Sequence, residues 1–176
     1  MQIHSEPHST SYFKKGLWWK IVLSIAIVLG LGFLSGYFSA PVEQDWYENL
    51  NKPVFQPPRW LFGPVWTVMY ILIGASFGII WQVSHKARYP IIKKFANRGL
   101  IIFIIHFVLN LLWTPLFFSL HAPGVALVDI VILLVLVIIL IRHFFRLDRI
   151  AAFLLIPYLI WILFATVLNA SILAIN

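Results

Sequence analysis

The sequence predicts an all-α membrane protein, a bundle of five transmembrane helices in which a long first connection caps one end. Composition is the first reason: 61% of the 176 residues are hydrophobic and 11% are charged, far from the average soluble domain. Segment length is the second, because about 20 apolar residues cross the hydrocarbon core of a bilayer. The chain holds such segments at residues 17–40, 62–83, 99–120, 125–143 and 151–175.

These segments use nearly the whole chain, so we expect a single transmembrane domain over residues 16–176. The polar residues 1–15 predict a flexible N-terminal tail. The sequence contains no cysteine, which excludes disulfides, iron–sulfur clusters and thiolate zinc sites. The other residues form no recognisable metal site, and we expect no obligatory cofactor.

The placement of positive charge predicts the orientation. Of the thirteen Lys and Arg residues, only Lys52 and Arg59 fall on the side of the first connection; the others flank the N-terminus and the second and fourth connections. Because loops rich in Lys and Arg stay in the cytoplasm, we expect a cytoplasmic N-terminus and an outer C-terminus, as in a bacterial cell membrane. The basic residues form small groups beside helices and no extended basic face, which excludes nucleic-acid binding.

The first connection, residues 41–61, is long for a compact bundle, and long connections are usually functional or disordered. Its aromatic side chains give it an apolar surface of its own, and three prolines stiffen it. It is either an aromatic belt at the membrane interface or a cap over the outer mouth of a cavity. We favour the cap, because Trp46 and Tyr47 lie in mid-connection beside charged residues.

Three apolar segments carry a proline close to a tryptophan, a combination that suggests helices bent around bulky side chains. Helical spacing then aligns aromatic and polar side chains on one face of each segment. These faces hold Trp66 and Tyr70 in the second segment, Asn110, Trp113 and Phe117 in the third, and Trp161, Ala165 and Asn169 in the fifth. Amides within a membrane need partners. The faces therefore predict an aromatic-lined pocket, which we favour, or amide contacts between helices around a solid core.

Glycines four residues apart let helix backbones approach closely. Gly32 and Gly36 form one such pair in the first segment, and Gly74 and Gly78 form another in the second. The sequence leaves open whether each pair packs within one chain or across a homodimer.

Several multi-residue strings follow one another along the chain. They are Trp46-Tyr47 with Leu50 and Lys52-Pro53; Pro57-Pro58 with Trp60; Phe62-Gly63-Pro64-Val65-Trp66-Thr67 with Tyr70; Asn110-Leu111 with Trp113 and Pro115-Leu116-Phe117-Phe118; Ala126-Leu127-Val128-Asp129; and Pro157-Tyr158 with Trp161, Phe164-Ala165 and Leu168-Asn169. With these strings the sequence resembles the tryptophan-rich sensory protein/translocator protein family, also called TspO/MBR or the peripheral-type benzodiazepine receptor family. The resemblance covers residues 17–176 and implies a bundle of five helices.

The resemblance also implies a pocket near the first connection that binds porphyrins, notably protoporphyrin IX, and synthetic benzodiazepine-type ligands. The positions that match the family's pocket are Trp46, Trp66, Asn110, Trp113, Trp161 and Ala165. Some members bind cholesterol, but the C-terminal segment here lacks the tyrosine and the final basic residue of their recognition motif, itself a weak pattern. The expected partners are a porphyrin or another flat hydrophobic molecule, and membrane lipid.

A porphyrin is a flat aromatic plate that tryptophan rings can sandwich, and its propionates need cations or donors. Lys52 and Arg59 are the predicted propionate contacts. We expect a binding protein that acts as a sensor, scavenger or transporter. The alternatives are an enzyme that degrades porphyrin oxidatively in light, with Trp66 and Trp161 as its redox-active residues, a cholesterol or lipid translocator, and an assembly partner of another membrane protein.

Overall fold

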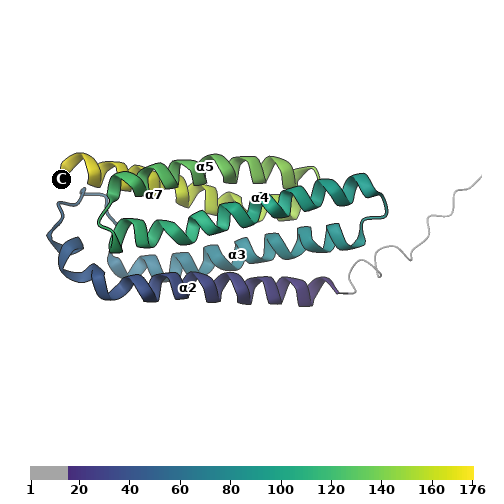
Figure 1. The fold of residues 1–176 in the computed structure, drawn as a ribbon, viewed down its shortest axis with the longest axis horizontal. Helices are drawn as coiled ribbons and strands as arrows, with labels where there is room; N and C mark the ends of the chain where they lie inside the picture. Colours follow the sequence, from purple (N-terminus) through teal and green to yellow (C-terminus); the bar gives the residue numbers. More distant parts are fainter. Residues whose placement is uncertain (1–15) are drawn as a thin grey trace, which may run out of the picture.

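The computed structural model describes the backbone of residues 16–176 and the side chains of residues 16–38 and 46–176. Over this range it is helical without strands, and five helical segments are long and apolar enough to cross a membrane. They lie lengthwise beside one another (Figure 1). The predicted five-helix membrane bundle is confirmed, and the predicted tail at residues 1–15 lies outside the described residues.

The helices run in the order α2 (Leu17–Asn49), α3 (Arg59–Lys86), α4 (Pro90–Thr114), η1 (Pro115–Ser119), α5 (Pro123–Phe145), α6 (Arg149–Leu154) and α7 (Ile156–Ile175). Large apolar side chains are exposed along several of them, such as Ile101, Ile105 and Val108 of α4, whereas Asn110 on the same helix is buried. Exposed apolar side chains of this kind are expected on helices that face lipid, because the hydrocarbon of the bilayer surrounds them as a protein core would.

The first connection is shorter than the sequence predicts. The prediction placed the end of the first helix at residue 40, but α2 continues through Pro41 to Asn49, so the connection to α3 is residues 50–58. Trp46 and Tyr47 therefore lie on a helix and not in mid-connection. Their rings pack edge-to-face against η1, Trp46 on Phe117 with centroids 5.8 Å apart and Tyr47 on Phe118 at 5.4 Å. Such tertiary packing outweighs the local preference of a proline to end a helix.

Two other prolines do break the regular helical pattern. Pro115 opens the π-helical turn η1, in which Leu120 N donates to Pro115 O over five residues at 2.9 Å. The last predicted span divides into α6 and α7 at Leu155, two residues before Pro157, which lacks an N–H to continue the α6 ladder. Both breaks lie near a tryptophan, as two of the three proline–tryptophan pairs suggest, whereas Pro64 of the third pair lies inside α3, which continues without a break.

The second pair of glycines packs α3 against α2 within the chain. A Cβ atom on Gly74 would lie 2.6 Å from Ile25 Cα, and one on Gly78 would lie 2.7 Å from Ile21 Cα. The two backbones are therefore in direct contact along this seam. Gly32 instead accommodates the ring of Tyr70, and Gly36 has open space around it.

The bundle has two different ends. The basic end, on the right in Figure 1, carries the connections at residues 87–89 and 146–148, and most Lys and Arg residues of the described range lie in or near these connections in the sequence. The loop end, on the left, carries residues 50–58, residues 120–122 and the C-terminal Asn176. Large apolar side chains pack the half near the basic end, where Ile80, Leu140 and Phe144 are completely buried. The loop-end half contains a cavity.

Candidate ligand-binding cavity

A cavity of about 590 Å³ occupies the loop-end half of the bundle. Its volume lies within the range of pockets that hold small organic molecules. Helices α2, α3, α4, α5 and α7 and the turn η1 all contribute to its wall. The hydroxyl of Ser35 on α2 donates to Leu111 O of α4 at 2.7 Å and ties two sides of this wall together.

The three predicted faces meet at this cavity. Of the eight predicted ligand-binding residues, the structure places seven in the wall: Trp66, Tyr70, Asn110, Trp113, Phe117, Trp161 and Ala165. Several of them support one another. Trp113 stacks on Phe117 with centroids 5.2 Å apart, and Trp66 lies tilted against Tyr70 at the same separation. The aromatic rings thus form a preassembled surface.

Trp46, the eighth predicted residue, lies behind the wall. Its indole stacks on the imidazole of His121 with centroids 4.5 Å apart and meets the edge of Phe117, which lines the cavity. His121 adopts a positive φ of 51°, in the turn before α5. In this structure Trp46 supports a wall residue from outside.

A chain of hydrogen bonds fixes the amide of Asn110. Asn110 Nδ2 donates to the hydroxyl of Tyr158 at 2.9 Å, and Tyr158 Oη lies 3.0 Å from His106 Nε2. Because the tyrosine oxygen accepts from Asn110, its own proton is best used toward the imidazole. Both Tyr158 and His106 are completely buried. This arrangement leaves Asn110 Oδ1 as the free polar atom of the amide.

Three polar atoms of the wall residues are buried without a hydrogen-bond partner among the described residues: Asn110 Oδ1, Trp113 Nε1 and Trp161 Nε1. Buried polar groups in folded proteins nearly always find a partner. A predominantly apolar wall with Arg59 as its charged member, whose residues also carry one unpaired acceptor and two unpaired donors, is suited to an aromatic ligand with a few polar atoms.

Asn169 also reaches the cavity, but its amide serves the neighbouring helix. In the amide orientation that satisfies both groups, its oxygen accepts from Leu127 N at 3.0 Å and its nitrogen donates to Pro123 O at 3.2 Å. These bonds tie α7 to Pro123 and Leu127 of α5, a carbonyl and an N–H four residues apart that a regular α-helix would pair with each other. For this residue, the helix-to-helix interpretation is the one the geometry supports.

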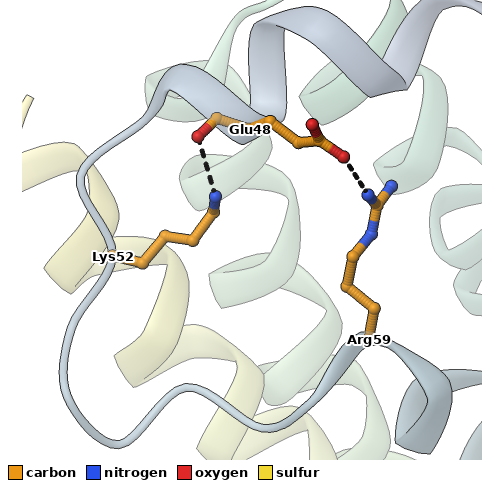
Figure 2. Close-up of polar contacts among 3 residues, drawn as sticks. All are labelled: Glu48, Lys52 and Arg59. Carbon is orange, nitrogen blue, oxygen red and sulfur yellow. Dashed lines mark hydrogen bonds and ion pairs between the residues drawn. The ribbon is translucent and has the colours of Figure 1, made fainter.

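Charged side chains gather at the mouth of the cavity, where α2 ends and α3 begins (Figure 2). Arg59 lines the cavity, and its Nη1 lies 2.7 Å from Glu48 Oε1. Lys52 Nζ donates to the backbone oxygen of Glu48 at 3.1 Å. Both cations also lie over the ring of Tyr47, Lys52 at 4.9 Å and Arg59 at 5.8 Å from its centroid. Of the two predicted propionate contacts, only Arg59 is part of the wall.

The connection at residues 50–58 is fastened to the end of α7. Asn51 N donates to Asn176 Oδ1 at 2.8 Å, and Asn176 Nδ2 donates back to Asn51 O at 3.0 Å. Phe55 adds an edge-to-face contact with Phe164 of α7. The connection is short and fastened at the loop end, but none of its residues lines the cavity, so a cap over the cavity mouth stays a prediction.

The prediction missed the contribution of α2 and α5 to the wall. Missed residues include Gly32, Phe33, Gly36, Tyr37, Ile130 and Leu133. Gly32 and Gly36 carried a signal, but small residues four apart suggest a helix contact as readily as space for a ligand. The apolar residues of α5 are indistinguishable by type from their lipid-facing neighbours.

Residues 24–175 match the sequence model of the TspO/MBR family. The chain belongs to the TspO/MBR family. It is 42% identical over 157 residues to the Tryptophan-rich protein TspO of Archaeoglobus fulgidus, covering 89% of this chain and 97% of that protein. The TspO of Chlorobaculum tepidum is 36% identical, with 89% and 95% covered. The Translocator protein of Homo sapiens is 31% identical, with 86% and 87% covered. This TspO/MBR chain is accordingly an integral, multi-pass membrane protein.

Proposed function

We propose that the protein binds a porphyrin-type tetrapyrrole in the loop-end cavity and acts as a sensor, scavenger or transporter of it. The observation that carries the proposal is the wall built from Trp66, Trp113 and Trp161, with two unpaired indole N–H groups. Indole faces favour a flat aromatic plate, and each offset or edge-to-face contact adds about 0.5–1.5 kcal/mol beyond burial. The names of the relatives, sensory protein and translocator protein, are compatible with a binding role.

The acidic groups of such a ligand have two places to bind. Arg59 at the mouth offers a guanidinium that matches the geometry of a carboxylate. The indole N–H groups of Trp113 and Trp161, which are buried and have no hydrogen-bond partner among the described residues, would become neutral donors if the rings turned toward the ligand. Lys52 lies near the mouth but outside the wall, and it adds positive charge at longer range.

The second candidate is an enzyme that degrades the porphyrin in light. It is favoured by Trp66 and Trp161 lining one cavity, where either indole could give an electron to a photoexcited porphyrin with dioxygen as the final oxidant. In the binder, the two indoles serve only as contact surface.

Replacing Trp66 and Trp161 together with phenylalanine separates these two functions. For a binder, affinity for protoporphyrin IX should fall no more than about tenfold, because an aromatic face remains at each position. Protein-dependent bleaching of the Soret band under illumination should be absent in both proteins. Phenylalanine is much harder to oxidise than tryptophan. If the wild type bleaches the porphyrin and the double variant binds it without bleaching, the protein is a porphyrin-degrading enzyme and not a binding protein.

The proposed orientation places the loop end outside and the basic end in the cytoplasm, following the distribution of Lys and Arg. Single cysteines can test it, since the chain has none of its own. We expect Val54→Cys, fully exposed at the loop end, to react with an impermeant maleimide added to intact cells. Tyr89→Cys, exposed at the basic end, should react only after lysis. The reverse labelling pattern would invert the topology.

A further inference from the structure

The carboxylate of Glu48 binds the guanidinium of Arg59, the group that a ligand carboxylate at the cavity mouth would also bind. Arg59 is the cation in the cavity wall, and its Nη1–Oε1 contact with Glu48 is 2.7 Å long. Figure 2 shows the two side chains meeting across the gap between the end of α2 and the start of α3. We propose that Glu48 is a specificity-determining residue, an internal competitor that makes the cavity discriminate against ligands bearing carboxylates relative to their uncharged counterparts. The inference rests on the proposed function and concerns the same cavity.

Glu48 is held where it can compete. It lies in the last turn of α2, next to Tyr47, whose buried ring packs on Phe117 and Phe118. Its backbone oxygen accepts from Lys52 Nζ at 3.1 Å. Because Lys52 binds the backbone, removal of the Glu48 side-chain charge leaves this bond in place. The acidic side chain can therefore be changed without removing the other cation at the mouth.

The ion pair is exposed enough to open. The side chains of Arg59 and Glu48 are 50% and 62% exposed, and such pairs contribute only about 0.2–1 kcal/mol. An entering carboxylate must displace Glu48 from Arg59 or share the guanidinium with it, against the repulsion of a second negative charge. A neutral ligand of the same shape meets neither obstacle. The ion pair therefore acts on charge and leaves the aromatic fit untouched.

The test compares protoporphyrin IX with its dimethyl ester, which has the same ring and no carboxylate. We expect Glu48→Gln to tighten binding of protoporphyrin IX by up to about fivefold, the upper limit set by an exposed ion pair. Binding of the ester should stay unchanged. The gain should shrink as salt is raised from low ionic strength, because screening weakens exposed charges. The dissociation constants are measured by Soret-band titration in one detergent at one concentration. Partitioning of the ligand into the detergent is then the same for every variant and cancels in the ratio of their dissociation constants.

Two controls isolate the ion pair. Asp148→Asn removes one negative charge at the basic end, where Asp148 caps α6 through Ala151 N and asparagine also caps well; it should change neither affinity. In an Arg59→Gln background, Glu48→Gln should lose most of its effect, as a double-mutant cycle requires of a coupled pair.

The outcomes separate the two claims. Weaker binding of the acid by Glu48→Gln would mean that Glu48 positions Arg59 for the ligand. Equal changes for acid and ester would mean that Glu48 does not act on ligand charge. Either result would make the inference wrong while porphyrin binding stands. If wild-type protein binds neither the acid nor the ester, the proposed function fails and the inference fails with it.

Discussion

Replacing Trp113 with alanine is expected to weaken protoporphyrin IX binding by about 1–3 kcal/mol, or roughly 5- to 150-fold. Trp113 lines the cavity, stacks on Phe117 and carries a buried N–H that has no hydrogen-bond partner among the described residues. Truncation removes a large aromatic contact and a donor at once. A titration that follows quenching of tryptophan fluorescence or the shift of the Soret band measures the change.

Two further variants serve as controls for the effect of Trp113→Ala on affinity. Trp18→Ala removes an equally large side chain that is 71% exposed near the basic end of α2, and it should leave affinity nearly unchanged. Trp113→Phe keeps an aromatic ring at this position, so the affinity that it retains relative to Trp113→Ala reports on the aromatic contact. If Trp113→Ala and Trp18→Ala have equal effects in folded protein, the wall around Trp113 does not hold the ligand.

Adding methyl groups at Gly74 and Gly78 is expected to destabilise the whole bundle. In Gly74→Ala/Gly78→Ala, each new Cβ would press on the α2 backbone, at Ile25 and Ile21. Backbone atoms cannot rotate away as a side chain can, so α2 and α3 must separate. Overpacking of this kind costs about 1–3 kcal/mol, which lowers the melting temperature by roughly 2–12 °C in a chain of this size.

Gly30→Ala is the matched control on α2, because no atom lies within 4 Å of its added Cβ. Alanine also favours a helix over glycine by about 1 kcal/mol, so this variant should be as stable as the wild type or more so. Thermal unfolding in detergent, followed by circular dichroism, compares the proteins. Unchanged melting of the double variant would refute a backbone contact between α2 and α3.

The five spans could be predicted because lipid imposes a simple rule on sequence: long apolar runs, with polar loops between them. The length of α2 could not. Pro41 is a local signal to stop, whereas the rings that carry the helix onward, Phe117 and Phe118, come some seventy residues later in the sequence. Contacts between residues far apart in the sequence determine where such a helix ends, and a local sequence pattern cannot predict these contacts.

For the cavity too, local patterns could be predicted from the sequence and contacts between distant residues could not. Periodicity identified the inward faces of α3, α4 and α7, because a helix of 3.6 residues per turn fixes which side chains share a side. It could not show that the amide of Asn169 would bond to α5, nor that the amide of Asn110 would be held by Tyr158. It also paired Lys52 and Arg59 by charge alone, although a neighbouring glutamate distinguishes them.

The seam between α2 and α3 restricts how this bundle could move a rigid molecule. Carriers that alternate between two open states part their helices first on one side of the site and then on the other. Below the cavity, toward the basic end, these helices touch backbone to backbone at Gly74 and Gly78. A porphyrin-sized plate could pass that way only if the contact came apart. If the protein carries such a molecule, entry and exit through the loop end would require less rearrangement, and the seam would then favour loading and unloading on one face of the membrane.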